Sequence, residues 1–173
     1  MYKHILVPLD GSALAEEALP DAVLMAESFQ GELTLLKVLV PLSNDKLRSR
    51  TGLNAAIKTT TFLILGYLED VAVCIRNHGV PVQVATVEGR PHEGIVQYVE
   101  ANNVDLIVMC TRGYSCLKRW LFGSVADRVA GDTSVPVLLV RARSERIFND
   151  SVLRGSYQNC LELSLIRKRR YNS

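Results

Sequence analysis

Residues 104–125, VDLIVMCTRGYSCLKRWLFGSV, contain the pattern that decides the fold. The stretch includes the apolar run 106–109, which is typical of a strand buried on both faces of a parallel sheet. The run breaks before Gly113, and a second glycine, Gly123, precedes a helical pattern that begins near Ser124. Glycine lets the backbone approach a ligand closely and adopt positive φ, and the first turn of a helix presents unpaired N–H groups. We therefore predict an anion-binding site in this segment.

Apolar stretches elsewhere in the chain predict more strands, and helical patterns separate them. The first helix is expected to be capped by Ser12, bent or split at Pro20 and ended near Gly31. Pro136 places the last strand at an edge of the sheet. We expect further strands at 3–9, 33–40, 82–87 and 135–140, and helices at 12–29, at 55–77, from 91 and at 124–131.

Alternating strands and helices predict the α/β class, with a single doubly wound, five-stranded parallel sheet and helices on both faces. Helices on both faces require a reversal in strand order. If strands one to three grow one way and strands four and five the other, the order is 3-2-1-4-5. In such sheets the ligand crevice lies outside the carboxyl ends of the two strands at the reversal. Asp10 ends the first strand and Gly113 follows the fourth, so both are expected at this crevice.

The long helical pattern at 55–77 has its candidate core positions in its second half. The run 62–65 is more apolar than one helix face requires, so we expect part of it to be exposed or to meet a partner. The expected core positions are Leu65, Leu68, Val71, Ala72 and Ile75.

Composition and charge favour a single ordinary globular domain. The chain has 173 residues, of which 48% are hydrophobic and 22% charged. Residues 141–173 contain eight Arg or Lys against three acidic residues, a net charge of +5, so residues 1–140 carry −3 of the total +2. We expect a nucleotide-binding domain at 1–143 and a poorly ordered basic tail at 144–173. The mildly acidic body gives no reason to expect nucleic acid, and no apolar run approaches the roughly 18 residues of a membrane helix.

The four cysteines show no metal-binding spacing, and no histidine lies at ligand distance along the chain. We therefore expect no metal site. Unpaired thiols in a chain without a visible secretory signal favour a reducing cytoplasm. Cys110 is expected to pack as a small apolar residue, with a redox-sensor role as the alternative.

Two polar positions at the predicted crevice have both a structural and a functional interpretation. Asp10 is either a turn residue before Gly11 or a carboxylate that contacts a ribose or a cation. Ser124 is expected to cap the helix that follows it, with Asp127 completing a capping-box-like pair. A capped first turn still offers its N–H groups to a phosphate.

Over about residues 1–141 the sequence resembles the universal stress protein family. The resemblance is carried by HILVPLDGS, LLKVL, YLEDVA and the long stretch DLIVMCTRGYSCLKRWLFGSVADRVAGDTSVPVLLVRA. The nucleotide-binding branch of the family has the pattern G-x2-G-x9-G-[S/T]. This chain reads Cys110-x2-Gly113-x9-Gly123-Ser124, with the first glycine replaced by cysteine.

The resemblance implies an ATP site, with Mg²⁺ as a candidate companion, and a homodimer that pairs through the last strand. The implied interface residues are Val135, Val137 and Leu139. The implied contacts are Pro8, Leu9 and Asp10 at the adenosine end, Val38 at the adenine, main chain of Met109 and Cys110 beside adenine and ribose, and Gly113, Gly123, Ser124 and Val125 at the phosphates.

We therefore predict a dimeric, cytoplasmic, ATP-binding stress-response module with a regulatory or protective role and an unidentified protein partner. The first alternative is a nucleotide-free dimeric interaction protein of the same fold. The second is a weak ATP hydrolase or nucleotidyl transferase. The sequence has no GxxxxGK[ST] loop and no clustered acids for two metal ions, and we assign no catalytic residue.

Overall fold

The computed structural model describes residues 1–41, 51–111 and 123–141, with the backbone alone for 51–60. Strands and helices alternate along these residues, as the sequence predicts. Their bounds are β1 His4–Pro8, α1 Ala13–Glu16, α2 Leu19–Phe29, β2 Glu32–Leu39, α4 Thr51–Arg76, β3 Val82–Glu88, α5 Pro91–Ala101, β4 Leu106–Thr111, α6 Ser124–Asp132 and β5 Val137–Arg141.

The five strands form one sheet in the order β3-β2-β1-β4-β5. Every neighbouring pair is parallel, so the predicted fold class and strand order are confirmed. β1 lies beside β4, with Ile5 opposite Leu106 and Leu6 opposite Ile107. β5 is an edge strand, and Pro136 precedes it rather than lying within it. The proline therefore removes no donor from the ladder between β4 and β5.

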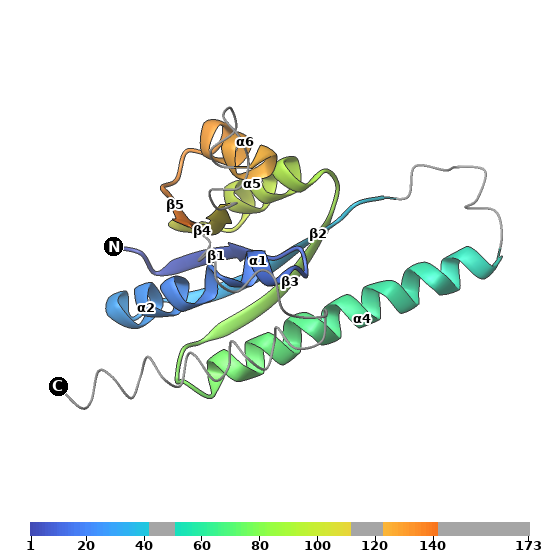
Figure 1. Ribbon diagram of the computed structural model, residues 1–173, viewed down its shortest axis with the longest axis horizontal. Helices are drawn as coiled ribbons and strands as arrows, with labels where there is room; N and C mark the ends of the chain where they lie inside the picture. The colour runs from blue at the N-terminus through green and yellow to red at the C-terminus, as the bar shows by residue number, and fades with distance from the viewer. Residues whose placement is uncertain (42–50, 112–122, 142–173) are drawn as a thin grey trace.

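Helices cover both faces of the sheet (Figure 1). α1, α2 and α4 lie on one face, and α5 and α6 lie on the other. Each face of the sheet has its own hydrophobic core. Because side chains alternate along a strand, Ile5 and Val7 pack into the core under α1, α2 and α4, whereas Leu6 packs into the core under α5 and α6. Strands buried on both faces in this way explain the continuous apolar runs in the sequence.

The first predicted helix is split at Pro20, which stands in the first turn of α2. Ser12 caps α1 as expected, since its hydroxyl accepts a hydrogen bond from the Ala15 N–H at 3.2 Å. Gly31 was expected to end α2, but the left-handed residue is Gln30, at φ 51°. Gly31 has a different role, because a β-carbon there would lie 2.8 Å from the carbonyl oxygens of Tyr2 and Lys3.

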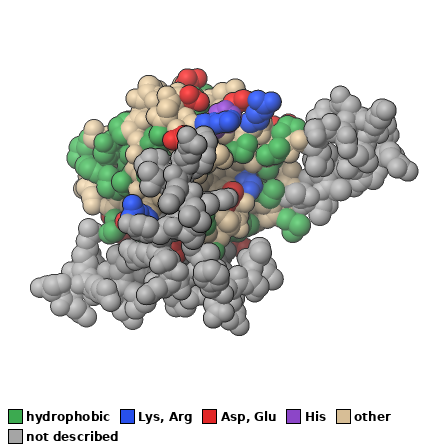
Figure 2. Space-filling model, turned by 45° about the horizontal axis from the view of Figure 1, so that its top comes forward, with side chains coloured by type: hydrophobic (Ala, Val, Ile, Leu, Met, Phe, Trp, Pro, Cys, Tyr) green, Lys and Arg blue, Asp and Glu red, His purple; other side chains and the backbone are tan. Residues whose placement is uncertain are grey.

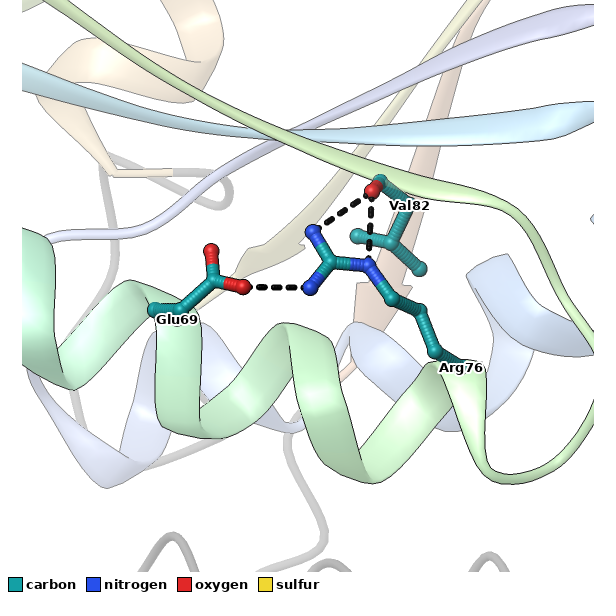
Figure 3. Close-up of polar contacts among 3 residues, drawn as sticks. All are labelled: Glu69, Arg76 and Val82. Carbon is teal, nitrogen blue, oxygen red and sulfur yellow. Dashed lines mark hydrogen bonds and ion pairs between the residues drawn. The ribbon is translucent and has the colours of Figure 1, made fainter.

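α4 packs against the sheet only through its second half, and its first half projects beyond the sheet (Figure 1). Four of the expected core residues are buried, but Leu65 is 39% exposed, so that prediction is wrong. The hydrogen bonds of Arg76 fix the end of the helix. Its guanidinium donates to the Val82 carbonyl from Nε at 3.0 Å and from Nη2 at 2.8 Å, and it pairs with Glu69 (Figure 3). The buried residues are Leu68, Val71, Ala72 and Ile75.

Among the described residues, no helix combines the length and apolarity that crossing a bilayer requires. The acidic and basic side chains of the described residues are interspersed in the space-filling view (Figure 2). The basic tail at 144–173 lies outside the described residues, so the domain boundary at 143 stays a prediction.

Candidate nucleotide pocket

A pocket of about 820 Å³ lies at the carboxyl ends of β1, β2 and β4. This is the place that the strand order selects, because the direction of the crossovers changes between β1 and β4. Gly113 falls outside the described residues. Every other residue that the resemblance implies for the nucleotide lines the pocket: Pro8, Leu9, Asp10, Val38, Met109, Cys110, Gly123, Ser124 and Val125.

Asp10 forms the turn between β1 and α1. Its Oδ1 accepts hydrogen bonds from the Ser12 N–H at 2.9 Å and the Ser12 hydroxyl at 2.5 Å. These bonds hold the chain where it turns from the strand into the helix. The structural interpretation of Asp10 is therefore correct, and because the residue also lines the pocket, the two interpretations are compatible.

Lys37 is a pocket residue that the sequence analysis missed. β2 runs beside β1, with Leu36 opposite Pro8, which brings Lys37 to the end of β1. Its Nζ donates to the Asp10 carbonyl oxygen at 2.5 Å. Burial lowers the pKa of the Lys37 ammonium, and the nearby Asp10 carboxylate acts in the opposite direction. The sequence shows a lysine within the apolar second half of this strand, but that pattern alone does not place it beside Asp10.

A partly buried hydrogen bond connects α1 to α4 close to the pocket. Glu16, at the end of α1, is 2% exposed, and its Oε1 accepts a hydrogen bond from the Tyr67 hydroxyl at 2.6 Å. Burial is the main cause that raises the pKa of the Tyr67 hydroxyl, and the hydrogen bond to Glu16 raises it further. Since α1 contributes Leu14 and Ala15 to the pocket lining, α4 supports that wall from behind.

The N-terminus of α6 also lines the pocket. Gly123 occupies the cap position with φ 84° and ψ 146°, and no side chain in the described part of the chain caps the helix. Ser124 is the first helical residue, so the expected capping box of Ser124 and Asp127 is wrong. An uncapped helix start leaves its N–H groups for a ligand. Asp127 and Arg128 also line the pocket, and the sequence analysis did not predict them there.

Cys110, which replaces a motif glycine, is compatible with an open pocket. It lies within β4 and is not among the described residues with positive φ, so this backbone does not need glycine there. Its side chain packs against the core formed with α1, α2 and α4. Burial, and then the negative charge of Glu17, raise the pKa of the thiol to about 11. This is the reverse of the electropositive setting that a redox sensor needs.

We expect Cys110 to react slowly with iodoacetamide at pH 8, because only the thiolate is nucleophilic. The labelling rate should rise steeply as the pH approaches about 11, the pKa of the buried thiol. Mass spectrometry of the Cys110 peptide over time measures this rate. The matched control is the same peptide in urea, where the thiol should label at the rate of an ordinary cysteine. Equal rates at pH 8 with and without urea would contradict the prediction.

The remaining cysteine among the described residues differs from expectation. Cys110 is a free thiol, but Cys74 is disulfide-bonded, so the prediction of unpaired thiols is wrong for Cys74. The inference of a reducing compartment loses its premise there, and a cytoplasmic location stays a prediction. Across the described residues, no group of three or more His, Cys, Asp or Glu could hold a metal ion.

The residues implied for a dimer interface are partly buried against the chain's own core. Val135 precedes β5, and Val137 and Leu139 pack against the core under α5 and α6. Leu138 is the exposed apolar residue of the strand, at 36%. A second copy pairing with this edge would therefore meet main-chain groups and Leu138 first.

Fold and pocket together define a doubly wound α/β protein with a pocket at its topological switch point. Comparison with known proteins gives the family. Residues 1–141 match the universal stress protein family, and the chain belongs to that family.

Individual relatives agree with this assignment. The chain is 32% identical over 141 residues to universal stress protein MJ0531 of Methanocaldococcus jannaschii, covering 82% of this chain and 83% of that protein. The solved structure of MJ0577 from the same organism is 30% identical, with a TM-score of 0.65, covering 84% of this chain and 99% of that one. A universal stress protein solved in complex with cAMP is 24% identical, with a TM-score of 0.61 and coverage of 80% and 97%, which shows a shared fold.

Proposed function

We propose that this protein is a nucleotide-binding universal stress protein whose pocket takes an adenosine nucleotide, with ATP as the favoured ligand. The observation that carries the proposal is the pocket of about 820 Å³ between the end of β1 and the start of α6. Small-molecule sites typically measure roughly 300–1,000 Å³ and combine apolar walls with a few placed polar groups. This pocket has that composition.

The two kinds of lining suit the two parts of a nucleotide. Leu9, Val38 and Met109 offer apolar surface for a base. At Ser124 and Val125 the start of α6 offers main-chain N–H groups and the positive end of the helix dipole to phosphates. Gly113 remains a proposed phosphate contact.

Mg²⁺ would enter with the nucleotide rather than through a preformed metal site. Mg²⁺ in nucleotide sites is commonly held by substrate phosphates together with one or two carboxylates. Asp10 and Asp127 are the carboxylates that line this pocket. The fold relative solved with cAMP also binds an adenine nucleotide, which supports the ligand class without fixing the number of phosphates.

Two measurements test the proposal. Mass spectrometry of the denatured, freshly purified protein should detect an adenine nucleotide. Isothermal titration calorimetry of nucleotide-free protein should detect ATP binding in the presence of Mg²⁺. Absence of both signals would favour the nucleotide-free interaction protein. Metal-dependent ATP turnover well above background, lost in Asp10→Ala, would favour the enzymatic alternative.

We further propose that the protein is a homodimer paired through β5. We expect Leu138→Lys to convert the dimer to a monomer, because lysine on an edge strand opposes pairing with another chain. Multi-angle light scattering after size-exclusion chromatography measures the molar mass. Val73→Lys is the control, since Val73 is a 47% exposed apolar residue outside the strands. A Leu138→Lys variant with the molar mass of the unmodified dimer would exclude this interface.

A further inference from the structure

Exposed apolar side chains concentrate on the outward side of α4. Of the seven large hydrophobic residues exposed in the described part of the chain, four lie on this helix. Phe62 is 76% exposed, Leu63 is 65% exposed and Val73 is 47% exposed. The opposite side of the helix is already buried in the core, so the other described residues leave this surface exposed. We call Phe62, Leu63, Leu65 and Val73 the outward α4 surface.

Cys74 lies next to Val73 and is disulfide-bonded. The chain has four cysteines, and Cys110 is free. The partner within this chain is therefore Cys116 or Cys160. Either choice would bring a segment outside the described residues to α4.

The sheet geometry favours Cys160. Arg76 contacts Val82 at the start of β3, whereas Thr111 lies at the carboxyl end of β4, three strands away in the sheet. The start of β3 and the end of β4 are about 17 Å apart along the strands and about 14 Å apart across three strand spacings. Cys116 follows Thr111 by five residues, which span at most about 18 Å. It would reach Cys74 only at full extension.

Cys160 has no such restriction. It follows Arg141 by nineteen residues, which can span roughly 65 Å. The residues after it suit the outward α4 surface in composition, because Leu161, Leu163, Leu165 and Ile166 come within six positions. The basic run 167–170 then follows, and Asp70 supplies exposed negative charge on α4.

We propose that the segment 157–170 lies along the outward α4 surface and is anchored there by a disulfide between Cys74 and Cys160. Forming this bond removes two protons and two electrons from two thiols. A low-molecular-weight disulfide such as oxidised glutathione accepts them by thiol–disulfide exchange and leaves as two thiols. The basic tail would then be ordered where it contacts α4. The proposal is independent of nucleotide binding.

The covalent part is tested by peptide mapping. The full-length protein is equilibrated in oxidised glutathione buffer, alkylated without reduction and digested. We expect a peptide linking Cys74 to Cys160, and its loss after dithiothreitol treatment. A link from Cys74 to Cys116, or Cys74 recovered alkylated without reduction, would overturn the proposal.

The docking part is tested by hydroxyl-radical footprinting of Phe62 and Leu63 without nucleotide. We expect their oxidation to increase in Cys160→Ser and in Leu163→Asp, which keeps the cysteines, and to be unchanged in Cys116→Ser. Equal oxidation of Phe62 in all four proteins would show that the segment does not cover the helix. Protection that depends on protein concentration would assign the surface to a second copy and also overturn the proposal.

Discussion

Replacing Gly31 with alanine should lower the free energy of unfolding by about 2 kcal/mol, the usual scale for forcing an extra methyl group into a packed site. The β-carbon would lie 2.8 Å from the Tyr2 and Lys3 carbonyl oxygens. Both obstacles are backbone atoms, and the Lys3 carbonyl also accepts the Glu32 N–H at 2.7 Å. Relief of the clash would therefore disturb the first pairing of β1 with β2. Chemical denaturation monitored by circular dichroism measures the change.

Gly66→Ala is the matched control for Gly31→Ala. Gly66 lies on the exposed side of α4, and nothing in the described structure lies within 4 Å of a β-carbon built there. Alanine is favoured over glycine inside a helix by roughly 0.8–1.0 kcal/mol, so this variant should be more stable than the unmodified protein. A Gly31→Ala variant as stable as Gly66→Ala would show that the Tyr2–Lys3 contact is not tight.

Gly123→Ala should weaken ATP binding about tenfold or more, which corresponds to about 1.4 kcal/mol. The cap residue has φ 84° and ψ 146°, close to a region that only glycine occupies readily. Alanine would rotate this residue and move the first turn of α6 relative to the rest of the pocket. The effect should appear in the dissociation constant measured by calorimetry.

Gly131→Ala is the control for Gly123→Ala, since it changes the same residue type at the other end of α6. A β-carbon at Gly131 meets nothing within 4 Å in the described structure. Its ATP affinity should equal that of the unmodified protein. If Gly123→Ala also binds ATP normally, the start of α6 does not hold the phosphates.

Local sequence patterns were sufficient to predict the layout of the fold. Apolar runs located the strands, and Pro20 located the break between α1 and α2. The patterns failed where a neighbour distant in the sequence decides the conformation. Gly31 is required by Tyr2 and Lys3, which immediately precede β1, and Leu65 is exposed because α4 extends past the sheet.

The candidate site shows the same division. Asp10, Gly123 and their neighbours could be predicted because strand ends and glycines are visible in the sequence. Lys37 could not, because its place beside Asp10 depends on the register of β1 with β2. The cap of α6 was also misassigned. Ser124 is a typical capping residue in the sequence, and only the backbone angles show that Gly123 occupies the cap position.

The sequence by itself determined the element order and the doubly wound α/β class, and it limited the strand orders and the places where a ligand site could lie. These follow from apolar periodicity and from the handedness of crossover connections, which act on short stretches of chain. Only the tertiary structure decided which charged groups line the pocket, which face of α4 the described residues leave exposed and how Cys110 is accommodated in β4. Those outcomes depend on strand register and layer packing, which join residues far apart in the chain.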